Sequence, residues 1–179
     1  MVCLMMKRII CAMLLVFFFT PDISYCQTLT GFSVLDSAFG DLNKDGIADK
    51  VVVYKSDREE SEPESARPLL VFHGTIDSSW VAAGRNDSLV MCASCGGVMG
   101  DPYMGISIES NTFSVYHYGG AAWRWSRDIT FFYHKKQKQY ILKKDTGTTF
   151  DAVEPNDSEN DIYNKEEWGK VSLTEYRLD

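Results

Sequence analysis

The chain has 179 residues, of which 24% are charged, 13% are aromatic and five are cysteine, and its formal net charge is −7. Binding of nucleic acid or of an anionic membrane requires a basic surface, which a chain with this net negative charge is not expected to have. The negative charge is compatible with binding of cations or basic partners. The length is enough for one domain with a sizeable core. The high aromatic fraction suits strands and their cross-strand pairs.

The first residues have the pattern of a signal peptide. Lys7 and Arg8 precede an unbroken apolar run at residues 9–19, which Pro21 and Asp22 then end. A run of this length matches the apolar region of a signal peptide, whereas a bilayer span needs about 20 apolar residues. We therefore expect residues 1–26 to be removed and residues 27–179 to form a single β-rich domain outside the cytoplasm.

Two ways of processing this segment remain open. Cleavage before Gln27 would give a soluble secreted or periplasmic chain with no transmembrane span. Alternatively, residues 23–26 form a loose lipobox, which would leave a lipid anchor on Cys26 at the envelope. Tyr25 is bulky at a position where a lipobox has a small residue, so the sequence favours the soluble product.

Two cysteines belong to the expected mature domain, Cys92 and Cys95 in the sequence C-A-S-C. In an oxidising compartment this pair predicts a local disulfide. A redox pair of thioredoxin type would need a helix after the second cysteine, and Gly96-Gly97 argues against one. A zinc site would need two further ligands, and the three histidines lie at no recognisable spacing: His73, His117 and His134.

The pattern along the chain predicts a mainly β fold, an antiparallel meander of hairpins. The turn residues Gly84, Asn86 and Asp87 are expected to separate two short strands. Charged and polar segments at residues 56–66 and 146–168 are expected as mobile surface loops. We expect strands at residues 29–35, 50–54, 69–72, 80–83 and 89–92, with a closing strand at 171–178.

Two hairpins give the strongest strand signal. Residues 106–108 and 113–118 alternate around a turn at Ser110-Asn111, and residues 123–133 return through 140–142 after a basic tip at 134–138. Phe113, Val115 and His117 would share one face of the first hairpin. On that apolar face, we expect His117 to be a hydrogen-bonded core histidine.

The most specific chemical pattern is an Asp-rich loop at residues 41–49. Calcium takes six to eight oxygen ligands, and a loop with an oxygen-bearing side chain at every second residue can surround it. Gly46 at position 6 permits the sharp reversal of the chain. The predicted ligands are the side chains at positions 1, 3, 5 and 9 and the carbonyl at position 7: Asp41, Asn43, Asp45, Asp49 and Ile47.

Two other loop types share features with a calcium-binding hairpin. An EF-hand requires a bidentate Glu at position 12 between two helices, but that position is Val52 in a strand-like run, so the EF-hand is excluded. A hairpin without metal, in which Asx turns are held by hydrogen bonds, remains the alternative.

Residues 39–53, F-G-D-L-N-K-D-G-I-A-D-K-V-V-V, resemble the calcium-binding hairpin of FG-GAP repeats, as in integrin α subunits, and of the related bacterial VCBS repeats. The resemblance implies one calcium ion, held by the ligands just named, between two antiparallel strands. Those families stack several repeats into a propeller, whereas this chain has a single such loop. A full propeller is therefore not expected, and the adhesion function of integrins is not carried over.

Three further groups of residues are candidates for a site. Trp123 and Trp125 flank Arg124 and would share a strand face, either as a stacking platform for a sugar or peptide or, more commonly, as core. Asp101, beside the glycine-dense segment 96–105, is a candidate general base or second metal ligand, although a turn carboxylate before Pro102 is favoured. The acidic segment 151–161 would bind a second cation or form a solvated loop, and its irregular spacing favours the loop.

The sequence favours a non-enzymatic, exported, calcium-stabilised β domain that acts as a binding or interaction module at the cell envelope. Its partner is expected to be an unidentified protein or glycan, not nucleic acid. Two alternatives stay open: a small secreted hydrolase that uses a cleft around the glycine-rich loop with Asp101, His117 or the calcium, and an inhibitor or immunity-type protein.

Overall fold

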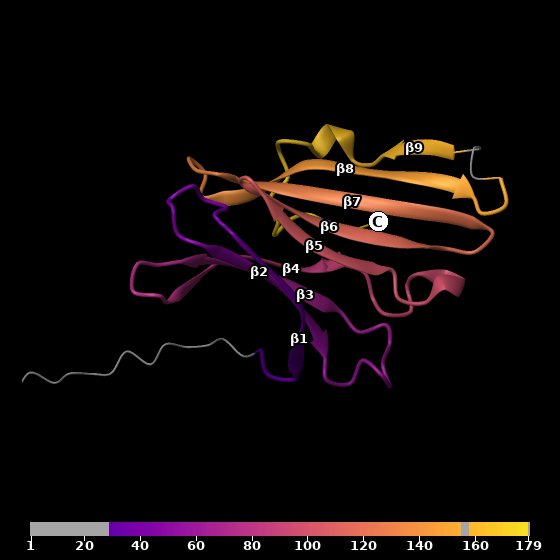
Figure 1. The fold of residues 1–179 in the computed structure, drawn as a ribbon, viewed down its shortest axis with the longest axis horizontal. Helices are drawn as coiled ribbons and strands as arrows, with labels where there is room; N and C mark the ends of the chain where they lie inside the picture. The colour runs from indigo at the N-terminus through magenta and orange to yellow at the C-terminus, as the bar shows by residue number, and fades with distance from the viewer. Residues whose placement is uncertain (1–28, 155–157, 179) are drawn as a thin grey trace, which may run out of the picture.

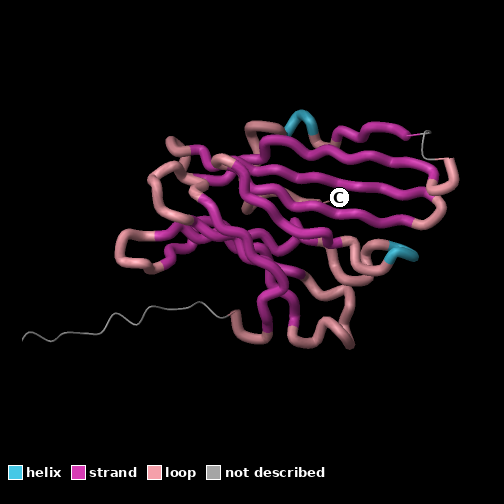
Figure 2. Tube along the Cα trace, in the orientation of Figure 1, coloured by secondary structure: helices cyan, strands magenta, loops and turns pink. Residues whose placement is uncertain are grey.

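The computed structural model describes residues 29–154 and 158–178 and consists mainly of two antiparallel sheets (Figure 1). The first sheet holds, in spatial order, β1 (Phe32–Gly40), β2 (Asp49–Ser56), β3 (Arg67–Gly74) and β4 (Trp80–Val90). The second holds β5 (Tyr103–Glu109), β6 (Thr112–Gly120), β7 (Trp123–His134), β8 (Gln139–Asp151) and β9 (Ser158–Ile162). The helices in the described parts are two short 3-10 turns, η1 (Gly97–Met99) and η2 (Lys165–Glu167) (Figure 2).

The prediction of a mainly β chain built from hairpins is confirmed, with two meanders in place of one. Within each sheet, every strand pairs with its neighbours in sequence. The predicted signal segment, with Cys26, lies outside the described residues. Among the residues that are described, no helix has both the length and the apolar character needed to span a bilayer.

Both predicted hairpins are present. Ser110, with a φ of 58°, forms the turn between β5 and β6, and residues 135–138 connect β7 to β8. Because neighbouring side chains on a strand point to opposite faces, the register of β6 places Phe113, Val115 and His117 together on the inner face. All three side chains are buried, as the sequence predicts.

The core lies between the two sheets, whose strands cross at an angle in Figure 1. It joins apolar side chains of β2 and β3 with those of β6, β7 and β8, including Val51, Leu69, Phe113, Ile129 and Leu142. At one side β1 contacts β5. A Cβ added at Gly40 would lie 2.5 Å from Cγ2 of Ile108, so a side chain at this position would force the two strands apart.

The C-terminal segment closes the opposite side, and the prediction of a strand at 171–178 is wrong. The segment makes one isolated bridge, between Ile141 and Ser172, followed by a turn at residues 173–175, and the rest is irregular. Leu173 and Tyr176 point into the core, and both of their carbonyl oxygens accept hydrogen bonds from Nδ2 of Asn86, at 2.5 and 2.8 Å. The burial does not alternate as in a strand, since the adjacent residues Ser172 and Leu173 are both buried. The Asn86 side chain satisfies two carbonyl oxygens that a neighbouring strand would bond in a sheet.

The two strands predicted at 80–83 and 89–92 are one continuous strand, β4. Its pairing with β3 shifts register twice, which accommodates the turn-favouring residues as irregularities within the strand. Buried Asn86 accepts hydrogen bonds at Oδ1 from the backbone N–H groups of Ser88 and Leu89, at 2.8 and 2.7 Å. Its side chain therefore satisfies the local backbone without ending the strand.

The segment 146–168, expected as a surface loop, also contains regular structure. It includes the end of β8, all of β9 and η2. Thr146 pairs with Ile162, and the hydroxyl of Thr149 donates a hydrogen bond to Asp161 at 2.7 Å. The threonines of β8 favour an extended backbone, and this outweighs the polar composition of the segment. The lead-in strand was placed too early, since β1 begins at Phe32, whereas residues 57–66 form turns, as expected.

Candidate metal and binding sites

The Asp-rich loop connects β1 to β2 and is anchored in the core. Leu42 is only 1% exposed and belongs to the main apolar cluster. The carboxylate of fully buried Asp49 accepts three backbone hydrogen bonds, from Leu42 and Asn43 at Oδ2 and from Gly74 at Oδ1, at 2.8, 3.1 and 3.0 Å. Asp49 therefore fixes the start of the loop and joins the loop to β3.

Backbone N–H groups also hold the outer part of the loop. Oδ1 and Oδ2 of Asp41 accept hydrogen bonds from the N–H groups of Asp45 and Gly46, at 3.1 and 2.9 Å. Oδ1 of Asp45 accepts one from Ile47 at 2.8 Å. This last bond, together with one from Asn43, lowers the pKa of Asp45 below its ordinary value. Gly46 adopts a φ of 85°, which a residue without Cβ tolerates.

One buried side-chain oxygen of the loop has no hydrogen-bond partner. The side-chain amide of Asn43 donates to Oδ2 of Asp45 at 2.9 Å, while its Oδ1 is buried and unpartnered. A buried polar atom without a partner is costly, and an oxygen in this position is the ligand type that a hard cation prefers. Each oxygen of Asp41 accepts one hydrogen bond and keeps a lone pair. The oxygens of Asp41, Asn43 and Asp45 thus fit a cation such as calcium.

The described parts of the chain contain no group of three or more His, Cys, Asp or Glu side chains arranged to hold a metal. In the loop, the third converging ligand would be the amide oxygen of Asn43. The hydrogen bonds of Asp41 and Asp45 are also those of the metal-free alternative with Asx turns. The unpartnered Asn43 Oδ1 is the feature that this alternative does not explain.

An exposed aromatic patch lies beside the loop on the outer face of the first sheet. Phe39 is 62% exposed and Trp80 37%, and their ring centroids are 6.3 Å apart. Nζ of Lys50 lies 4.5 Å from the ring centre of Trp80 and 4.8 Å from that of the buried Phe72. We call Phe39, Lys50, Phe72 and Trp80 the aromatic patch.

Strand pairing connects this patch to the loop. Phe39 pairs with Lys50 at the base of the β1–β2 hairpin, directly before the loop begins. Trp80 pairs with Gly74, whose N–H donates to Asp49. A Cβ added at Gly74 would lie 2.2 Å from the carbonyl oxygen of Ala48, so the loop packs tightly on β3. The loop therefore packs directly against the strands that carry the patch.

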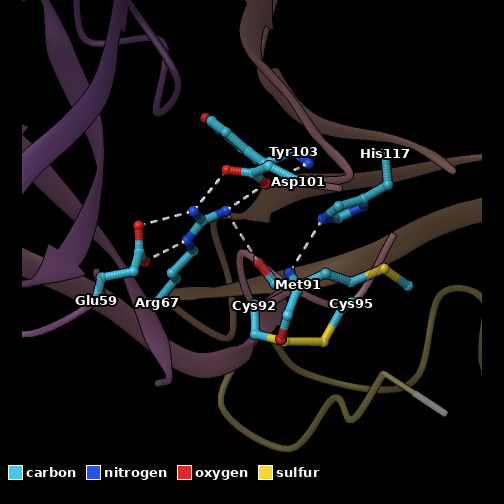
Figure 3. The surroundings of a disulfide bond; sticks show 9 residues. Glu59, Arg67, Met91, Cys92, Cys95, Asp101, Tyr103 and His117 are labelled. Atoms are coloured by element: carbon cyan, nitrogen blue, oxygen red, sulfur yellow. Dashed lines mark hydrogen bonds and ion pairs between the residues drawn. A yellow bond between two sulfur atoms is a disulfide. The ribbon is translucent and has the colours of Figure 1, made fainter. Parts of the chain in front are cut away.

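A second cluster surrounds the guanidinium of Arg67, which is 1% exposed (Figure 3). Arg67 donates to Glu59 at 2.7 and 2.9 Å, to Asp101 at 2.7 and 2.6 Å, and to the carbonyl of Met91 at 3.3 Å. Burial lowers the pKa of Arg67, but the bonds to Glu59 and Asp101 outweigh burial and raise it above the ordinary value. The cluster is a satisfied ion-pair network that joins β3, β4 and the segment before β5.

The structure places Asp101 and His117 beside this network. Both carboxylate oxygens of Asp101 accept hydrogen bonds from Arg67, whereas His117 is bonded through Nε2 and its buried Nδ1 has no partner. Asp101 Oδ1 also accepts the N–H of Tyr103 at 3.0 Å, as expected for a turn carboxylate. Burial raises the pKa of Asp101, while its bonds from Arg67 and Tyr103 lower it, with a net value below the ordinary one. The prediction that His117 is a hydrogen-bonded core histidine is confirmed: it is 1% exposed, and its Nε2 accepts the N–H of Met91 at 3.2 Å.

This environment does not favour the hydrolase alternative. Burial first, and then the charge of Arg127, lowers the pKa of His117 to about 4, so the ring is neutral. A general base must reach the proton that it removes from a substrate. A groove beside the cluster includes Met91 in its wall, but neither Asp101 nor His117 contributes to that wall.

Cys92 and Cys95 form the predicted local disulfide, with their Cα atoms 5.1 Å apart. Cys95 is exposed and Cys92 is half-buried. A groove of about 340 Å³ opens beside the bond, and both cysteines belong to its wall. Its other lining residues include Ala66, Val90, Met91 and Leu178.

The Trp123–Trp125 pair is only partly buried. Trp123 is 54% exposed and is therefore not a core residue. Trp125 is half-buried, and a Cβ added at Gly119 would lie 2.5 Å from its Cζ2. The stacking role of this pair remains a prediction. The zinc alternative gains no support, since His73 bonds to the hydroxyl of Tyr140 at 2.9 Å and the described residues hold no metal-binding group of the kind named above.

Comparison of the chain with protein-family models, with curated proteins and with solved structures finds no match. The resemblance to FG-GAP and VCBS hairpins therefore rests on residues 39–54 alone. The fold and the loop define a two-sheet antiparallel β protein with an Asp-rich hairpin loop, an exposed aromatic patch and a surface disulfide.

Proposed function

We propose that this chain is an exported β domain that is stabilised by one calcium ion and acts as a binding module at the cell envelope. The observation that carries the proposal is the buried, unpartnered Oδ1 of Asn43 in a loop whose other side-chain ligands are carboxylates. Calcium takes oxygen ligands of both kinds.

The ion would be held by Asp41, Asn43, Asp45 and Asp49 and by the carbonyl of Ile47. Its positive charge offsets the repulsion between the carboxylates that the loop brings together. Binding to the folded chain alone stabilises that state by mass action. Because Leu42 and Asp49 anchor the loop in the core, an ion in the loop also stabilises the β1–β2 hairpin.

The aromatic patch is the surface that we assign to the partner. Exposed aromatic rings are frequent in interaction sites, since they offer a large apolar area with few rotatable bonds. Phe39 and Lys50 lie on the two strands that the loop connects, and Trp80 pairs with Gly74, whose N–H donates to Asp49 at the end of the loop. Calcium in the loop would therefore stabilise the strands that carry the patch. The partner is a protein or a glycan, and the predicted signal segment would place it in the periplasm or outside the cell, with a lipid anchor at Cys26 as the alternative.

A binding experiment with matched variants tests this function. The full chain is applied to a glycan array and to immobilised envelope extract, in calcium and in chelator. The double variant Phe39→Ser, Trp80→Ser removes the exposed rings, and Val153→Ser, at a residue 84% exposed elsewhere, is the control. We expect calcium-dependent binding that the control keeps and the double variant loses. Equal binding by both variants would place the partner surface elsewhere.

A further inference from the structure

We propose that the Cys92–Cys95 disulfide is a redox centre that exchanges with a dithiol bound in the adjacent groove. Exposed Cys95 and half-buried Cys92 both line this groove, so an attacking sulfur has access to the bond. This activity is separate from calcium binding and from the aromatic patch, which lies on the outer face of the first sheet.

The first argument is that the bond has little structural value. A disulfide stabilises a protein mainly by restricting the unfolded chain, and the effect grows with the length of the loop that it closes. The Cys92–Cys95 bond closes a very short loop, because the two cysteines have a sequence separation of 3 and belong to one turn. It connects no two strands and joins neither sheet to the other.

The second argument is that hydrogen bonds hold the same turn without the disulfide. Before it, Met91 is fixed from both sides, by Arg67 at its carbonyl and by His117 at its N–H (Figure 3). After it, Gly96 donates to Gly100 at 3.0 Å and accepts from Gly120 at 2.9 Å. Both ends of the turn therefore keep their positions when the bond is reduced.

Within the turn, two backbone bonds add to this support. The N–H of Ser94 donates to the carbonyl of Pro63 at 3.3 Å, and the N–H of Cys95 donates to the carbonyl of Cys92 at 3.1 Å. The two sulfurs would thus stay close together as thiols. Such an arrangement allows a cysteine pair to open and close in the folded state.

The asymmetry of the pair sets the direction of attack. A thiolate of the substrate attacks Sγ of Cys95, the more exposed cysteine, and forms a mixed disulfide while the Cys92–Cys95 bond breaks. Sγ of Cys92 leaves as a thiolate and takes up a proton. The hydroxyl of Ser94, 3.5 Å from this sulfur, is placed to donate a hydrogen bond to the leaving group.

The second thiolate of the substrate then attacks the substrate sulfur of the mixed disulfide and releases Cys95. The substrate dithiol is oxidised to a disulfide, and the protein disulfide is reduced to two thiols, so electrons and protons balance without a further reactant. The segment after Cys95 contains a 3-10 turn of three residues, so this exchange does not use the helix N-terminus of thioredoxin-type enzymes.

The groove indicates the kind of dithiol. Its wall includes the apolar side chains of Ala66, Val90, Met91 and Leu178 next to the sulfurs, and also the exposed carboxylate of Glu64. An extended peptide with two cysteines and an apolar flank fits such a wall better than one with an acidic flank, which Glu64 would repel. The substrate class is therefore a protein or peptide dithiol with apolar residues beside the cysteines.

The test is reduction of the folded full chain by dithiothreitol, with alkylation and peptide mapping to follow Cys92 and Cys95 separately from the other cysteines. We expect both to be alkylated while circular dichroism shows the native fold. The double variant Cys92→Ser, Cys95→Ser should fold as the parent does. A disulfide that is reduced only in denaturant, or a double variant that fails to fold, would overturn the proposal.

Mapping of the mixed disulfide tests the direction of attack. Brief reaction of the oxidised parent with reduced glutathione, stopped by acid and alkylation, should leave glutathione on Cys95 about ten times as often as on Cys92, because access to the attacked sulfur is one of the factors that set the rate of exchange. Equal labelling, or more labelling of Cys92, would contradict attack at Cys95. Dithiol peptides with an apolar and with an acidic flank test the groove, and equal rates for the two peptides would contradict its assignment.

Discussion

Arg67 of β3 and Asp101, just before β5, form a two-point ion pair between the two sheets, with Nη1–Oδ1 and Nη2–Oδ2 distances of 2.7 and 2.6 Å. The same guanidinium donates two further hydrogen bonds to Glu59. Paired, hydrogen-bonded charges of this kind avoid the cost of an isolated buried ion. The pair holds the segment that carries the disulfide and the glycine-dense loop.

Removing this guanidinium should destabilise the fold. In Arg67→Met, the carboxylates of Glu59 and Asp101 lose their partner, and we expect the free energy of unfolding to fall by about 3 kcal/mol in urea denaturation. The control is Arg58→Met, whose pair with Glu62 is exposed, with 75% of the arginine side chain accessible. In Arg58→Met the free energy of unfolding should change by no more than about 0.5 kcal/mol. Equal losses in the two variants would contradict this role of Arg67.

The packing of the C-terminal segment should depend on the hydroxyl group of Tyr176. Tyr176 donates to Oδ2 of buried Asp145 at 2.6 Å and accepts from Nη2 of Arg127 at 3.2 Å. Tyr176→Phe leaves Asp145 with one donor fewer, so the free energy of unfolding should fall by about 1–2 kcal/mol. Tyr116→Phe, which removes a half-buried hydroxyl bonded to Ser107, is the control and should cost less. Guanidinium unfolding of both variants gives the comparison.

The buried His117 should make stability depend on pH. Its pKa is about 4 in the folded chain and near 6.5 when unfolded. Between these values the unfolded state binds a proton that the folded state does not. The contribution of neutral His117 to the free energy of unfolding is therefore fully present above pH 6.5. It is lost as the pH is lowered towards 4, by up to about 3 kcal/mol.

His117→Gln isolates this effect, because glutamine does not titrate and its side-chain oxygen is able to accept the N–H of Met91. Urea denaturation at pH 7.5, 6 and 5 should show a steeper loss for the parent than for the variant. His73 and His134 are present in both proteins, so their contributions cancel. Parallel curves would show that the burial of His117 has no effect on its protonation.

The features predicted correctly from the sequence are local ones. The two hairpins and the disulfide follow from alternation, turn residues and a short cysteine spacing, and each involves residues close together in the chain. The aromatic patch was missed because Phe39 and Trp80 come together only through the pairing of β1, β2, β3 and β4. The sequence signal available for it was the Phe39–Lys50 pair across the predicted hairpin.

The Arg67 cluster was missed for the same physical reason. Met91 comes near Arg67 through the pairing of β3 with β4, and Asp101 does so only when the two sheets pack. Glu59 is only eight residues away, but no local pattern marks a buried ion pair. Asn86 misled the prediction of β4, because its side chain bonds to the C-terminal segment, which is distant in sequence. Long-range hydrogen bonds here determine whether a turn-favouring residue ends a strand.

Calcium-dependent thermal unfolding of the full chain tests the central claim most directly. With calcium at about 100 times its dissociation constant, binding should add about 2.7 kcal/mol and raise the melting temperature by several degrees relative to chelator. Asp45→Ala should abolish this shift. Asp77→Ala, which removes an exposed turn carboxylate bonded to Ser79, should retain it. A melting curve of the parent protein that is the same in calcium and in chelator would contradict the claim.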